Sequence, residues 1–141
     1  MQDKVIYNLI FNRMTSTKKR WIYCIAVLIN VPVGLATRKY GYAMPAIVAT
    51  YGGDVFSASC IFFGLRFLFP KPALWKIALW NYLVCIAIET SQLCQAPWLQ
   101  KIRNTPPFGI LLGYGFLWSD WVCYAVGTVI AFLICWMIER K

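Results

Sequence analysis

Residues 121–138 read WVCYAVGTVIAFLICWMI, an apolar run without a charged side chain. Asp120 stands just before this run and Glu139 just after it. A helix needs roughly 20 predominantly apolar residues to cross the hydrocarbon core of a bilayer. The stretch therefore predicts a transmembrane helix over about 120–138.

Three further apolar runs precede this one, at about 21–40, 54–69 and 73–94. Of the 141 residues, 60% are hydrophobic and 13% are charged, whereas soluble domains are roughly half apolar and about a quarter charged. A bilayer supplies the apolar surroundings that so many side chains require. We therefore predict an all-α membrane protein with four transmembrane helices, forming a single membrane domain over 1–141.

The segments outside these runs are less regular. Residues 1–17 carry an apolar stripe that fits an interfacial helix, and a flexible tail fits the same residues equally well. Residues 46–51 and 109–118 are apolar but too short to span, so we expect interfacial or re-entrant segments there, the second one between helices 3 and 4. Gly34 and Ala36 also leave open a cleaved signal peptide in the first run.

Lysine and arginine predict the orientation, because cytoplasmic loops carry an excess of these residues. The N-terminal segment, the turn at 70–76 and the C-terminus hold nine of them: Lys4, Arg13, Lys18, Lys19, Arg20, Lys71, Lys76, Arg140 and Lys141. The two alternate loops hold four: Arg38, Lys39, Lys101 and Arg103. We therefore expect both termini in the cytoplasm.

The composition also excludes several classes of function. The chain has no histidine, which removes histidine-ligated haem, histidine zinc sites and Ser-His-Asp catalysis. Its six cysteines form no C-x-x-C pair, although a disulfide between Cys94 and Cys123 is conceivable near the outer face. We expect no metal and no cofactor. We also expect the net charge of +9 to serve topology and lipid contact, not nucleic-acid binding.

In this topology, polar side chains from separate parts of the chain meet at one membrane face. Three of the five acidic residues lie at the outer ends of expected helices, and two arginines lie in or beside the outer loops. Together with one glutamine they form a candidate polar site: Arg38, Asp54, Glu89, Gln92, Arg103 and Asp120.

Glu89 is the most informative of these residues and the candidate catalytic one. A charged side chain within the hydrocarbon costs about 2.5–3.5 kcal/mol on insertion scales, so it needs a partner or a water-filled pocket. Gln92 projects from the same side of the helix, and an arginine of the outer loops is the expected ion partner. Asp54 and Asp120 are expected to act as N-caps. The alternative is a cap network that only ties the helix ends together.

Arg66 lies one turn before the expected end of its helix. Its long side chain is expected to extend to the membrane interface, and we assign it no functional role.

The order of these motifs resembles the VanZ-like superfamily of small bacterial membrane proteins. Those proteins carry E-x-x-Q at a helix end and D-x-x-x-N-x-x-G opening the last helix, which here correspond to Glu89, Gln92, Asp120 and Gly127. Tyr124 stands where the pattern has asparagine, so no role of that asparagine carries over.

A fuller set of stretches resembles a bacterial inner-membrane family of unknown function, DUF2809-like and related to VanZ. The resemblance covers roughly 21–136 and includes GLATR at 34–38, YGGD at 51–54, IETSQL at 88–93 and GFLWSD at 115–120. It implies the bacterial plasma (inner) membrane and a role in the cell envelope, without a defined activity.

Three functions fit these expectations. The first is binding or processing of an envelope amphiphile such as a lipid-linked precursor, because arginines can hold a phosphate and Glu89 can act as an acid or a base. The second is a structural or assembly subunit of a membrane complex. The third is transport of a proton or small ion, since intramembrane carboxylates mark such pathways. Membrane lipids are the expected partners; the sequence leaves enzymatic activity and oligomeric state open.

Overall fold

The computed structural model describes the backbone of residues 2–105 and 118–140, and the side chains of 16–105 and 118–140. These residues form helices and no strand. In chain order the elements are α1 (Gln2–Lys39), the short 3-10 helix η1 (Gly41–Ala43), α2 (Ala46–Leu68), α3 (Leu74–Ser91), α4 (Pro97–Arg103) and α6 (Trp118–Arg140). The all-helical fold class is therefore confirmed.

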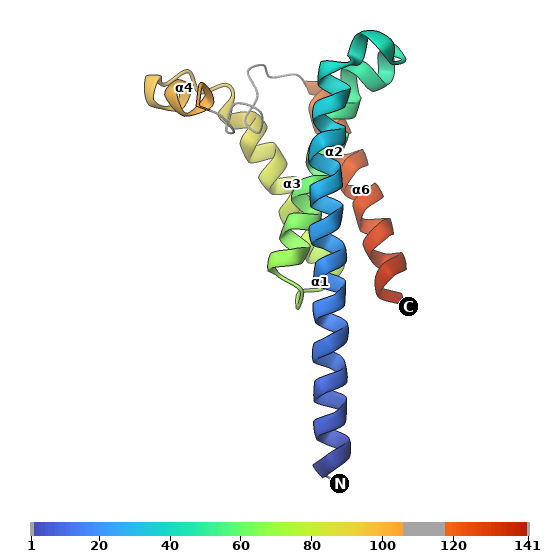
Figure 1. Cartoon of the computed structure of the whole chain (residues 1–141). Helices are drawn as coiled ribbons and strands as arrows, with labels where there is room; N and C mark the ends of the chain where they lie inside the picture. The colour runs from blue at the N-terminus through green and yellow to red at the C-terminus, as the bar shows by residue number, and fades with distance from the viewer. Residues whose placement is uncertain (1, 106–117, 141) are drawn as a thin grey trace.

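Helix α1 runs without interruption from Gln2 to Lys39. Its N-terminal half extends beyond the other helices (Figure 1). The sequence predicts that residues 1–17 are separate from the first span. Residues 2–17 instead continue it as one helix, because no glycine or proline lies between residues 2 and 31 to end the helix.

Helix α2 begins at Ala46, directly after Pro45. Residues 46–51 are therefore its first part and not a separate interfacial or re-entrant segment. The prediction of Asp54 as an N-cap is wrong for the same reason, since Asp54 lies more than two turns inside the helix. The glycines at positions 52 and 53, which suggested a loop, are tolerated in α2 because α1 packs closely against them.

Helix α3 ends at Ser91, three residues before the expected end of the third span, and α4 follows at Pro97–Arg103. Helix α6 begins at Trp118, so Asp120 lies in its first turn. The segment 109–118, expected to be interfacial or re-entrant, lies outside the described residues except for Trp118, which belongs to α6.

The four long helices run alternately up and down (Figure 1). At one end, Arg20 of α1 donates a hydrogen bond to the carbonyl of Phe67 in α2, and Tyr23 donates one to Glu139 in α6. At the other end, α1 pairs with α2, and α3 pairs with α6, through the polar residues of the candidate site. Helix α2 contacts α1, α3 and α6.

Small residues allow α2 and α6 to approach closely. A Cβ atom built on Gly127 would lie 2.4 Å from the carbonyl oxygen of Val55 and 2.9 Å from the Cβ of Ala58. At the same crossing, Ser59 Oγ lies 3.0 Å from the carbonyl oxygen of Val55 and 3.1 Å from that of Gly127, so the two carbonyls share its single hydroxyl hydrogen. Close backbone approach and cross-helix hydrogen bonds of this kind drive helix association in membranes.

The outward-facing surface of the bundle is apolar, and many of its buried side chains are polar. Large apolar side chains are exposed along α1, α3 and α6 and near the two ends of α2, whereas Arg66, Asn81, Glu89, Gln92 and Asp120 are buried. Within the described part of the chain, three helices are long and apolar enough to cross a membrane: Ser16–Lys39, Ala46–Leu68 and Trp118–Arg140. These features indicate a multi-pass membrane protein.

The cysteines do not form the conceivable disulfide. Cys94 is exposed, Cys123 is buried, and both carry free thiols, as do the other four cysteines. Cys85 and Cys135 pack in the interior among apolar side chains, where a free thiol behaves as a small apolar group.

Candidate functional site

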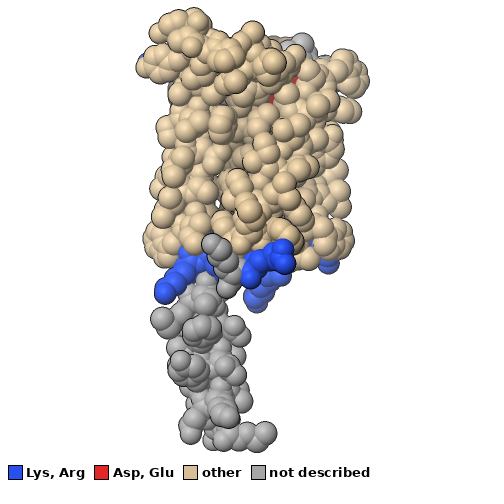
Figure 2. All heavy atoms as spheres, turned by 90° about the vertical axis from the view of Figure 1, so that its right-hand side faces the viewer, with Lys and Arg blue, Asp and Glu red and all other residues tan. Residues whose placement is uncertain are grey.

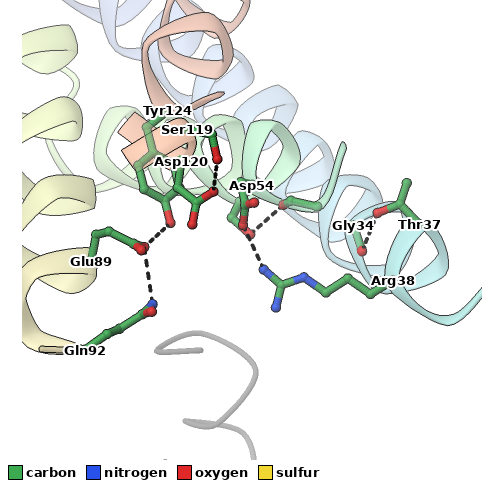
Figure 3. A network of polar contacts seen from close by, with 11 residues as sticks. Gly34, Thr37, Arg38, Asp54, Glu89, Gln92, Ser119, Asp120 and Tyr124 are labelled. Carbon is green, nitrogen blue, oxygen red and sulfur yellow. Dashed lines mark hydrogen bonds and ion pairs between the residues drawn. The ribbon is translucent and has the colours of Figure 1, made fainter. Parts of the chain in front are cut away.

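Glu89 lies in the last turn of α3 and is fully buried. Its carboxylate oxygen Oε2 accepts a hydrogen bond of 2.7 Å from Tyr124 Oη and one of 3.2 Å from Gln92 Nε2 (Figure 3). Gln92 lies on the same side of the chain, as the three-residue spacing predicts. The cost of burying this carboxylate is thus offset in part by two donors, one from α6 and one from the end of α3.

Tyr124 is the residue that sequence reasoning missed. It is buried on α6, four residues after Asp120, so both side chains lie on the same face of that helix. Tyr124 also lies within electrostatic range of all three carboxylates of the site, those of Asp54, Glu89 and Asp120. Tyr124 stands where the pattern quoted from the sequence has asparagine, and this departure from the pattern was the available signal.

Asp120 is buried in the first turn of α6, where its charge interacts favourably with the helix dipole. Ser119 Oγ lies 3.3 Å from its Oδ1 and donates to it. Asp54 of α2 lies on the same side of the site, close enough for the two carboxylates to repel each other (Figure 3). The site therefore gathers negative charge that needs a cation.

Arg38 supplies a cation from the end of α1. Its Nη2 lies 3.1 Å from Asp54 Oδ1 in an ion pair, and 43% of its side-chain surface remains exposed. Gly53 makes room for this arrangement, because a Cβ atom there would lie 2.8 Å from Arg38 Nε. In the Gly-Gly-Asp sequence of α2, Gly53 thus leaves space for the Arg38 side chain and Asp54 binds its guanidinium.

Arg103, the last residue of α4, is buried against the end of α3. Its guanidinium donates to the carbonyls of Ser91 and Cys94. The last carbonyl groups of a helix have no partners within the helix and carry a partial negative charge, so a cation stabilises them. Of the two arginines considered as partners for Glu89, Arg103 therefore caps α3, and Arg38 pairs with Asp54.

A narrow groove of about 100 Å³ lies between α1 and α2, below Arg38. Apart from Arg38, its lining is mostly apolar and includes Val31, Leu35, Phe56 and Ile61. The groove thus combines mostly apolar walls with one charged residue, Arg38, which belongs to the polar site. Among the residues that the structure describes, no group of three or more acidic or cysteine side chains is placed to hold a metal ion.

A second polar cluster lies at the opposite end of the bundle, around Arg66. Arg66 is buried among protein side chains and lines a pocket at that end, and its reach to the membrane interface stays a prediction. Its Nε lies 2.7 Å from Glu139 Oε1, and its Nη1 donates to the carbonyl of Pro72 at 2.6 Å. Tyr23 Oη donates to the same oxygen of Glu139 at 2.7 Å. Glu139 lies at the end of α6, far from Arg66 in the sequence, so the sequence alone did not suggest this contact with α2.

Comparison with known protein families identifies the family of this chain. Residues 43–128, more than half of its length, match the model of a protein family of unknown function, DUF2809. The chain belongs to this family. No solved structure matches the chain. The DUF2809 match contains Asp54, Glu89, Gln92, Arg103 and Asp120 of the polar site, as well as Tyr124, whereas Arg38 precedes it.

Proposed function

We propose that this DUF2809 protein binds an amphiphile with an anionic headgroup, such as a lipid-linked envelope precursor, at the outer face of a bacterial plasma membrane. The proposal includes four transmembrane helices, both termini in the cytoplasm, and kinship with the VanZ-like superfamily. The function is carried by one observation: the groove between α1 and α2 is mostly apolar along its length and ends at the exposed guanidinium of Arg38.

The course of α3 supports a fourth span. Helix α3 has 18 residues, about 27 Å at 1.5 Å per residue, close to the hydrocarbon thickness of about 30 Å. It starts at the end of the bundle where Arg66 binds Pro72 and finishes where Glu89 meets Tyr124. It therefore connects the same two polar ends of the bundle as α2 and α6 do.

The chemistry of the groove fits a lipid with a phosphate. An acyl or prenyl chain is compatible with the apolar walls formed by Val31, Leu35, Phe56 and Ile61. Arg38 lies at the charged end, and a guanidinium offers five donors in a planar fork that matches phosphate oxygens. Its Nη2 donates a hydrogen bond to Asp54 Oδ1, so the ion pair orients the guanidinium at the charged end of the groove.

Glu89 has a positioning role in this proposal. It is fully buried, so it does not line the groove. By holding Tyr124, it keeps α3 and α6 together beside Asp54 and Asp120. In this proposal Arg38 contacts the headgroup directly. The Glu89–Tyr124 hydrogen bond maintains the arrangement of the helices around the site.

The decisive experiment compares Arg38→Ala with Lys39→Ala. Both changes remove one exposed cation from the end of α1, but only Arg38 lines the groove. Binding of a polyprenyl phosphate and of the uncharged polyprenol is measured on purified protein by native mass spectrometry. We expect Arg38→Ala to weaken binding of the phosphate about tenfold and Lys39→Ala to change it less than twofold. Equal binding of polyprenol and polyprenyl phosphate, or equal effects of the two variants, would contradict the proposal.

A groove-filling variant tests the apolar half of the same site. Cys60 lines the groove, whereas Cys24 is similarly half-buried on α1 outside it. Cys60→Trp should reduce binding of both polyprenyl compounds, while Cys24→Trp should leave it unchanged. Unfolding temperatures of the two variants show whether any loss reflects misfolding.

The second candidate function is a structural or assembly subunit, which the complete burial of Glu89 favours. In that case the polar network serves only to hold α3 against α6. Glu89→Gln distinguishes the two functions. If the network is only structural, lipid co-purification should fall no further than the folded yield does. If the outer site is a binding site, the folded variant should bind the polyprenyl phosphate more weakly. A folded variant that retains the same lipids would remove Glu89 from the binding proposal.

A further inference from the structure

The opposite end of the bundle carries a pocket with a different character from the α1–α2 groove. It has a volume of about 220 Å³ and lies between α1, α2 and α6. Its polar lining residues are Ser16, Lys19, Arg20, Tyr23, Arg66 and Glu139. On the face shown in Figure 2, the lysine and arginine side chains gather at this end.

The charges inside this pocket are only partly balanced. Arg66 and Glu139 form an ion pair of 2.7 Å, and Tyr23 donates to the same carboxylate oxygen, so the single acid of the pocket is already neutralised. Lys19 and Arg20 form no ion pair within 4 Å with any acid in the described part of the chain. The pocket thus keeps an excess of two positive charges.

Arg20 is held in a fixed position. Its Nε donates a 3.1 Å hydrogen bond to the carbonyl of Phe67, and its guanidinium carbon lies 5.0 Å from the centre of the Phe67 ring. These contacts use one side of the guanidinium. Within the described residues, its two terminal nitrogens make no hydrogen bond. A pre-positioned guanidinium loses less entropy on binding an anion than a flexible one does.

Two exposed tryptophans near the pocket favour a position at the depth of lipid headgroups. Trp21 is 64% exposed next to it, and Trp75, just beyond the α2–α3 turn, is 61% exposed. Exposed tryptophans mark the membrane–water interface. We propose that this pocket binds the phosphate of an anionic glycerophospholipid from the leaflet on its own side. Arg20 and Lys19 hold the phosphate oxygens, with the Ser16 hydroxyl beside them.

The inference does not depend on the proposed function at the outer face, because none of its residues lines that site. It is tested on the full chain in detergent by native mass spectrometry. The probes are dioleoyl phosphatidylglycerol, dioleoyl phosphatidylcholine and inorganic phosphate. The double variant Lys19→Ala/Arg20→Ala is compared with Lys18→Ala/Lys71→Ala, which removes the same charge at the same end without altering the pocket lining.

We expect phosphatidylglycerol to bind more tightly than phosphatidylcholine. Lys19 and Arg20 contact the phosphate directly in this proposal, and hydrogen bonds between charged groups are about twice as strong as neutral ones, so the pocket variant should bind phosphatidylglycerol more than tenfold more weakly. The control variant should lose less than twofold. Arg20→Lys keeps the charge but not the fork, should weaken binding about threefold, and serves as the test if the double variant fails to fold.

Three results would overturn the inference. Equal losses in the two double variants would show diffuse attraction to a basic surface. Equal affinity for phosphatidylcholine would show that negative charge on the lipid is not recognised. Binding of inorganic phosphate with the same dependence on Lys19 and Arg20, without a gain from the lipid, would make the pocket a site for free phosphate.

Discussion

The hydroxyl of Tyr124 in α6 donates a 2.7 Å hydrogen bond to the buried carboxylate of Glu89 in α3. This contact joins two helices whose other cross-helix polar bond runs from Asn81 Nδ2 to Thr128 Oγ1, at 2.7 Å. Both bonds are buried, and at the end of α3 the Glu89–Tyr124 contact anchors the polar site. The relationship explains how a carboxylate is accommodated in the interior of a small helical bundle.

Tyr124→Phe should destabilise the fold. The change removes the donor without removing the ring, and it leaves a buried carboxylate with one donor fewer; a hydrogen bond to a charged group contributes about 1.5–3 kcal/mol. The unfolding temperature in detergent is the measurement. Tyr82→Phe is the matched control, because Tyr82 is also packed in this region and its hydroxyl has no hydrogen-bond partner in the described structure. Equal melting of the two variants would argue against a stabilising Glu89–Tyr124 bond.

Gly53→Ala should displace Arg38 from Asp54 while leaving the fold intact. The added Cβ would lie 2.8 Å from Arg38 Nε, and the flexible arginine can move away. Since the pair is partly exposed, its loss should cost about 1 kcal/mol or less. Binding of the polyprenyl phosphate should nevertheless fall as it does in Arg38→Ala. Gly64→Ala is the control in the same helix, because a Cβ atom at Gly64 would have no neighbour within 4 Å. A similar loss of binding in this control would contradict the claim that Gly53 leaves space for Arg38.

Gly127→Ala should be much more harmful. The new methyl would lie 2.4 Å from the carbonyl oxygen of Val55, and a backbone atom cannot move without shifting α2. Overpacking of this kind costs about 1–3 kcal/mol, and separation of the helices would also strain the Ser59 bond to the Gly127 carbonyl. Folded yield and unfolding temperature measure the effect, with Gly64→Ala again for comparison. A Gly127→Ala protein as stable as the wild type would mean that α2 and α6 are not in such close contact.

Arg66→Ala should destabilise the end of the bundle opposite the candidate site by about 3–5 kcal/mol, because removing one partner leaves the other charge partly buried without compensation. Lys71→Ala, which removes an exposed cation nearby, should change stability by less than about 0.5 kcal/mol. The double variant Arg66→Met/Glu139→Leu removes both charges and should recover part of the loss. Thermal unfolding of the four proteins decides the matter: an Arg66→Ala variant no worse than Lys71→Ala would show that the Glu139 pair contributes little.

Composition and local periodicity predicted the all-helical class and the central parts of the four long helices, but not α4 or the start of α2. The run at 121–138 lies within α6, and the spacing of Glu89 and Gln92 places both at the end of α3. These features depend on residues close in sequence, since an apolar run or a three-residue spacing acts within one helix. The start of α2 was placed too late because the two glycines looked like a loop, and only the packing of α1 shows why they are tolerated.

Partners across helices were decided by the tertiary structure alone. Tyr124 meets Glu89, Arg38 meets Asp54, Arg103 caps α3, and Arg66 meets Glu139. Several acids and arginines were available at each end of the bundle, and charge by itself does not choose among them. The choice follows from the rotation of each helix about its own axis and from the close contact of α2 with its neighbours, which small residues such as Gly53 and Gly127 permit.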